Sequence, residues 1–221
     1  KPDGHTLKAA ALMMEGKLPE AEKEANAALA VAPNNADAMV VLASQKIRSS
    51  DAAGAMQLID RGLSDDPDNK DLLLFKLRVL YDQHRTNDVI AVLRRLHELD
   101  PANGSYAVDL ANQLAASGDS AGAESTFKQA LEANQDSDAV LAAYAHYLLS
   151  QRNRDQAIQE IKSLADRAKN RTKYLLLLEQ LYIAASRLDD AAALMTDLQQ
   201  NATVANDRLK AQVELARIAF L

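Results

Sequence analysis

The stretch that decides the fold is residues 15–35, which read EGKLPEAEKEANAALAVAPNN. A glycine after the first helical run is followed by an alanine-rich, acidic run that closes at Pro33. Glycine commonly ends a helix in the left-handed conformation, and proline cannot continue one. The stretch therefore predicts a turn, a helix and a stop. Residues 117–134, SGDSAGAESTFKQALEAN, show the same glycine followed by an alanine-rich run, although no proline closes it, and this similarity indicates an internal repeat.

The repeat has a constant step of 34 residues, the distance that separates Pro33, Pro67 and Pro101. One column at this step holds small or modest side chains: Ala21, Ala55, Val89, Ala123, Ala157 and Ala191. Another is apolar throughout: Ala25, Ile59, Leu93, Phe127, Ile161 and Met195. The step predicts six units without insertion, at about residues 2–35, 36–69, 70–103, 104–137, 138–171 and 172–205.

Each unit divides into two helical runs with a short polar turn between them, such as residues 37–49 followed by SSDAAGA. This 34-residue helix–turn–helix unit resembles the tetratricopeptide repeat, and the resemblance covers almost the whole chain. It implies a single all-α solenoid, in which antiparallel helical hairpins stack into a right-handed superhelix. Lys46 and Glu179 are charged where the family has apolar or small residues, which predicts looser packing in the second and sixth units.

Residues 206–221 continue the helical pattern as a terminal helix and end within it. The chain also starts without an initiator Met. From both features we expect a fragment of a longer protein, whose upstream part could carry a signal peptide or a lipid anchor.

The resemblance implies a binding surface, because the first helix of each repeat in this family lines an inner, concave face. At the 34-residue step, three columns of residues fall on this face. Two of the columns are mostly apolar and the middle one is polar, a pattern that suits an extended peptide or an amphipathic helix. The expected groove residues are Val40, Ser44, Ile47, Leu74, Arg78, Tyr81, Val108, Asn112, His146, Leu149, Leu176 and Gln180. The alternative is that some of the apolar members only pack between units.

A local excess of basic residues stands out in an otherwise acidic chain. Between positions 152 and 173 lie Arg152, Arg154, Lys162, Arg167, Lys169, Arg171 and Lys173, opposed by three acidic residues. One interpretation is a docking patch for an acidic partner or polymer, and the other is a solvated surface.

Composition and missing motifs exclude several function classes. The net charge of −6 disfavours nucleic acid as a partner. The chain has no cysteine, its four histidines are scattered, and it lacks a phosphate-binding loop or a nucleophile elbow. We therefore expect no catalytic, metal-binding or cofactor-binding residues, and no enzyme activity. No apolar run is long enough to insert into a membrane.

The leading prediction is a scaffold that binds a protein or peptide partner and organises a bacterial complex of the secretion or exopolysaccharide-export type. The cell envelope or periplasm is slightly favoured over the cytoplasm by analogy with scaffolds of this family. One alternative is a non-catalytic accessory region of a larger enzyme or export machine. Another is a self-assembling array joined through the apolar run IAFL at residues 218–221. Polysaccharide binding is disfavoured, because the chain has no Trp and few other aromatic residues.

Overall fold

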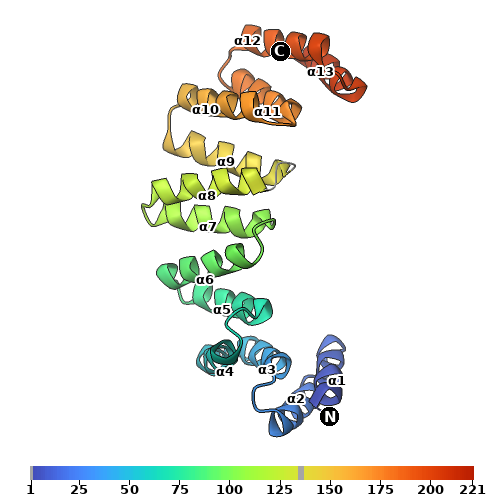
Figure 1. Ribbon diagram of the computed structural model, residues 1–221, viewed down its shortest axis with the longest axis vertical. Helices are drawn as coiled ribbons and strands as arrows, with labels where there is room; N and C mark the ends of the chain where they lie inside the picture. The colour runs from blue at the N-terminus through green and yellow to red at the C-terminus, as the bar shows by residue number, and fades with distance from the viewer. Residues whose placement is uncertain (1, 134–136) are drawn as a thin grey trace. The chain divides into compact units, whose positions relative to one another are not determined.

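The computed structural model describes residues 2–133 and 137–221. Within these ranges the regular structure consists of thirteen α-helices and no strand (Figure 1). The chain divides into two compact units, Lys1–Asp100 and Pro101–Leu221. The predicted all-α class is confirmed, whereas one continuous solenoid through all six repeats stays a prediction.

The first unit holds three helical hairpins. Its helices are α1 (Pro2–Met14), α2 (Leu18–Val31), α3 (Ala36–Arg48), α4 (Ala52–Asp65), α5 (Lys70–Asp82) and α6 (Thr86–Leu99). Each odd-numbered helix packs against the helix that follows it, and α1, α3 and α5 also contact one another in sequence. The hairpins therefore stack side by side, with the first helices forming one row.

The second unit holds three more hairpins and one additional helix. Its helices are α7 (Gly104–Ala116), α8 (Ser120–Ala133), α9 (Asp138–Gln151), α10 (Arg154–Arg167), α11 (Arg171–Ala184), α12 (Leu188–Asn201) and α13 (Ala205–Ile218). The contacts repeat those of the first unit, with α7, α9 and α11 in a row and α13 packed on α12. Because α13 follows the sixth hairpin at the same step, it has the register of a seventh first helix.

The helices of a hairpin cross at the column of small side chains, and this column is fully buried in every repeat. Its members are Ala21, Ala55, Val89, Ala123, Ala157 and Ala191. The apolar column four residues further on, from Ala25 to Met195, is equally buried. A short side chain at the crossing lets two helix axes approach closely enough for the larger column beside it to pack.

The same backbone conformation recurs in the turns of five of the six hairpins. Gly16 and Gly118 have φ values of 76° and 91°, in the left-handed region expected from the sequence. The same column holds three non-glycine residues with positive φ: Ser50, His84 and Ser186. The fifth hairpin differs, because Arg152 in this column is extended, with φ −132°, and α9 continues one residue further.

Side-chain capping separates the starts of the first helices into two groups. Asn35, Asn69, Asn103 and Ser137 precede α3, α5, α7 and α9, and each accepts a hydrogen bond from a backbone N–H of the first turn. The residues before α11 and α13 are Asn170 and Val204, and neither makes a side-chain cap. Helices α11 and α13 thus start without the side-chain hydrogen-bond acceptor that precedes α3, α5, α7 and α9.

Glu179 is fully buried, contrary to the looser packing expected for the sixth repeat. The Nη2 atom of Arg217 on α13 donates a hydrogen bond of 2.7 Å to Glu179 Oε1. The other carboxylate oxygen, Oε2, is buried and has no hydrogen-bond partner among the described residues. Burial raises the pKa of Glu179, although the charge of Arg217 opposes this effect. The acid therefore links α11 to α13, but with one oxygen unsatisfied.

We predict that Ala123→Arg destabilises the second unit by more than about 3 kcal/mol, because it places a long charged side chain at a closed helix crossing. Thermal unfolding followed by circular dichroism measures the effect. Ala121→Arg is the matched control, since Ala121 lies on the same helix and is exposed. An unchanged midpoint for Ala123→Arg would contradict the packing described above.

We also predict that Glu179→Gln raises the free energy of unfolding at neutral pH by about 1 kcal/mol, because a buried charge is replaced by a neutral isostere. A carboxyl with a raised folded-state pKa costs stability above its ordinary value of 4.5, and this cost disappears as the pH falls through the raised pKa. The advantage of the variant should therefore shrink on acidification. Urea titrations across this range measure it, and a difference independent of pH would refute the assignment.

Candidate partner-binding surfaces

In the first unit, six of the expected groove residues lie on α3 and α5, two helices that pack against each other. Those on α3 are half-buried: Val40, Ser44 and Ile47. Those on α5 are exposed: Leu74, Arg78 and Tyr81. Each trio has the spacing i, i+4, i+7, so its members share one helix face. An apolar–polar–apolar pattern is thereby presented twice.

In the second unit, the other six lie on α7, α9 and α11, which also pack in sequence. Val108 and Leu176 are half-buried, while the remaining four are exposed: Asn112, His146, Leu149 and Gln180. The set of twelve is hereafter called the inner-column residues, and none of them is buried. That they form one groove through both units stays a prediction.

The basic residues at positions 152–173 are spread along α10 and the segments on either side of it. Arg152 and Arg154 lie at the start of α10, whereas Arg167 ends it and the three that follow lie beyond. A helix of 14 residues separates its ends by about 20 Å. Lys162 is exposed in between. Lys169, Arg171 and Lys173 line one cavity, whereas a docking patch that includes the whole run stays a prediction.

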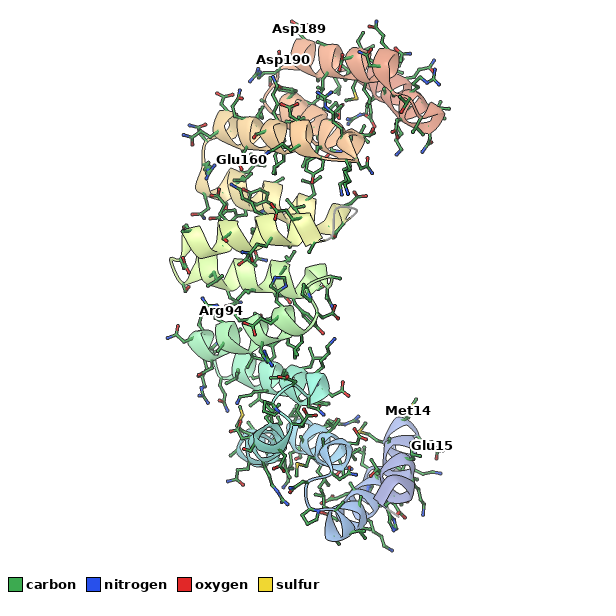
Figure 2. The ribbon with its side chains drawn as sticks, viewed as in Figure 1. Met14, Glu15, Arg94, Glu160, Asp189 and Asp190 are labelled. Atoms are coloured by element: carbon green, nitrogen blue, oxygen red, sulfur yellow. The ribbon has the colours of Figure 1, made fainter. Side chains whose placement is uncertain are left out.

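Arg152 belongs to a network of charged side chains that joins α8, α9 and α10. Its Nη2 atom lies 2.5 Å from Glu124 Oε2, and Lys128 Nζ lies 2.7 Å from Glu124 Oε1 and 2.8 Å from Glu160 Oε1. The hydroxyl of Tyr144 donates to Glu160 at 3.5 Å. Figure 2 labels Glu160 on α10. Arg152 thus contributes to packing between the fourth and fifth repeats.

Electrostatics keep Glu124 ionised. Burial opposes the ionisation of Glu124, but the hydrogen bonds and positive charges of Lys128 and Arg152 outweigh it and lower the pKa of this carboxyl. The contacts of this network are not evident from the sequence, because Glu124 and Glu160 are 36 residues apart. The one available signal was Arg152 in the turn column, where the other hairpins have a left-handed residue.

A cavity of about 570 Å³ lies where the C-terminal end of α12 and the starts of α11 and α13 meet. Four basic residues line it: Lys169, Arg171, Lys173 and Lys210. The first three were singled out from the sequence, and Lys210 was not. Lys210 lies 34 residues after Leu176, which also lines the cavity, so the repeat step could have found it.

Known proteins share parts of this sequence and this fold. Residues 114–181 match the family model described as the tetratricopeptide repeat. Residues 114–181 are thus similar to the tetratricopeptide repeat, and the helices on both sides repeat the same hairpin. No curated protein matches the sequence of the chain.

Several solved structures resemble the chain in fold. The structure of Pseudomonas aeruginosa pilF is 21% identical, with a TM-score of 0.58 over 96% of this chain and 97% of that one. A tetratricopeptide repeat protein from Parabacteroides merdae is 15% identical, with a TM-score of 0.60 over 99% and 87%. A chain of Naa15/Naa10 bound to HypK-THB is 15% identical, with a TM-score of 0.51 over 98% and 34%. At these identities the likeness concerns the fold alone.

The tetratricopeptide repeat family is generally non-catalytic. Among the described residues, no cluster of three or more His, Cys, Asp and Glu side chains could hold a metal ion. His5 is bound to Glu24 at 2.7 Å, and His146 is exposed on α9. In the described ranges, no helix has the length and apolar character needed to cross a membrane.

Proposed function

We propose that the chain is a non-catalytic scaffold that binds protein or peptide partners through the inner-column residues. One observation carries the proposal: Leu74, Tyr81 and Leu149 are large side chains on first helices, yet they are 39%, 37% and 40% exposed. Partner binding would remove this apolar surface from water, which contributes roughly 1 kcal/mol or more for each side chain. Tyr81 also belongs to a residue type that is enriched at binding hot spots.

The polar members of the set supply direction and specificity. Arg78 lies between Leu74 and Tyr81 on α5, and Asn112, His146 and Gln180 occupy the same column on the other helices. Apolar contacts flanking a polar seam suit a partner that is extended or helical, because both present side chains at regular intervals. Since the chain carries a net charge of −6, the proposal excludes nucleic acid as a partner.

The more specific proposal is a role in assembling a bacterial multiprotein complex of the secretion or exopolysaccharide-export type, in the cell envelope. It rests on the cysteine-free, alanine-rich composition and on analogy with scaffolds of this family. A non-catalytic accessory region of a larger enzyme or export machine has the same surface and differs only in what adjoins it.

We expect Leu74→Glu with Tyr81→Glu to weaken partner binding by more than about tenfold. The two apolar side chains would be buried in the complex, and the variant would bury two charges there instead. Leu149→Glu tests the second unit separately. Partners are captured from the native extract and identified, and dissociation constants are measured with purified components. Val31→Glu is the matched control, since Val31 is an exposed apolar residue on a second helix, α2. Equal capture by parent and variants would move the binding site elsewhere.

Self-association is a second candidate function, favoured by the exposed apolar face of α13. Leu209 and Val213 are 58% and 57% exposed, although Leu175 in the column of Leu209 and Ala145 in the column of Val213 are buried. In the six hairpins the second helix packs on the first. A second copy of the chain could cover Leu209, Val213 and Phe220 in its place.

We expect the molar mass from light scattering to rise with concentration toward that of a dimer. Leu209→Glu with Val213→Glu should hold the chain at the monomer mass, because two charges cannot be buried in an apolar contact. Leu7→Glu serves as the control, as Leu7 is exposed on α1, in the other unit. A mass that stays monomeric at all concentrations argues against this second function.

A further inference from the structure

We propose that the cavity between the starts of α11 and α13 binds an acidic segment of a protein partner. The inference rests on the proposed function, because it specifies the chemistry of part of the partner. It does not depend on Leu74, Tyr81 or Leu149, none of which lines the cavity. The volume of about 570 Å³ is within the usual range of ligand pockets and accommodates a few side chains of a peptide.

The positive charges of the cavity come from separate parts of the chain. Lys169 lies in the loop after α10, Arg171 and Lys173 in the first turn of α11, and Lys210 on α13. They converge although 41 residues separate the first from the last. Arg171 and Lys210 make long ion pairs of 3.5 and 3.6 Å with neighbouring carboxylates. Ion pairs of such length at the surface contribute little, so both cations can reorient toward a ligand.

Three carboxylates also line the cavity, and two of them have partners there. Asp207 Oδ2 accepts a hydrogen bond of 2.8 Å from Thr172 Oγ1, which holds α11 and α13 together. Asp197 Oδ1 accepts one of 2.8 Å from Asn201. The third is Asp138, at the start of α9. Four cations therefore face three carboxylates, a positive balance in a chain whose net charge is −6.

The start of α11 conflicts with ordinary helix electrostatics. The N-terminal end of a helix is positive, and α3, α5, α9 and α13 each place an acidic residue in their first turn. The first turn of α11 has no acidic residue and carries Arg171 and Lys173 instead. This arrangement lowers helix stability, and the ion pair of Arg171 with Asp166 and the hydrogen bond from Thr172 to Asp207 offset only part of the effect. Local conflicts of this kind are typical of functional sites, and a bound carboxylate would resolve this one.

The remaining lining favours a peptide over a polyanion with a continuous phosphate backbone. Leu175, Leu176 and Leu198 provide apolar contacts beside the cations, suited to a peptide that alternates acidic and apolar side chains. Leu176 is also an inner-column residue, so the acidic segment would lie next to the apolar contact surface of the second unit.

The test uses a fluorescein-labelled peptide of alternating glutamate and leucine and its glutamine counterpart, with binding followed by anisotropy. We expect the glutamate peptide to bind and the glutamine peptide to bind at least about tenfold more weakly. Lys169→Gln with Lys210→Gln should reduce affinity for the glutamate peptide by about tenfold. Arg154→Gln is the matched control, because Arg154 is an exposed cation outside the cavity and should leave affinity unchanged.

A second variant separates binding from folding. Arg171→Asp introduces an acid into the first turn of α11, so we expect the melting temperature to rise by about 1–3 °C while peptide affinity falls. Opposite signs in the two measurements support a functional role for the cation. A fall in both measurements would indicate that Arg171 is structural, and this outcome overturns the inference.

Other outcomes would also refute the proposal that the cavity binds an acidic segment. Equal binding of the two peptides, or a loss of binding with Arg154→Gln as large as that with the double variant, refutes the cavity as the site. Tighter binding of single-stranded DNA, lost in the same double variant, reassigns it to a polyanion. If the inner-column variants abolish capture of a native partner while the glutamate peptide does not bind, the scaffold function stands and only this inference fails.

Discussion

The close approach of two antiparallel helices at the small-residue column is the constraint on which the structure depends. From Ala21 to Ala191 the side chain at this crossing is short and fully buried, and the larger column four residues away packs beside it. Neither helix of a hairpin can bury its apolar stripe alone, so each hairpin also requires its neighbour. The row of first helices in each unit, and with it the spacing of the inner-column residues, follows from this contact.

Two residues that depart from the repeat, Arg152 and Glu179, form ion pairs with residues of neighbouring repeats. Arg152 takes the turn column of the fifth hairpin and instead reaches Glu124, within a network that includes Lys128 and Glu160. Glu179 takes a column that is otherwise apolar and is held by Arg217. The first network is fully paired, whereas Glu179 retains a buried oxygen without a partner. A buried charge with an unsatisfied oxygen costs stability.

The two candidate surfaces of the second unit differ in their physical basis. The inner-column residues offer periodic apolar area with a polar seam, which gives affinity through burial. The cavity at the start of α11 offers converging positive charge, which gives direction and selectivity for a partner of opposite sign. Leu176 belongs to both, so a single partner can engage the two together.

The sequence by itself determined the repeat, the helical class and the helix-ending role of Gly16 and Gly118, because periodicity and backbone preference are local properties. It also placed all twelve inner-column residues at positions that remain accessible. Only the tertiary structure decided which charged residues meet. Glu124 with Glu160, Glu179 with Arg217, and Lys169 with Lys210 are each at least 36 residues apart, and α10 separates basic residues that are close in the sequence. Charge has no period of its own, so its partners emerge only when the hairpins are stacked.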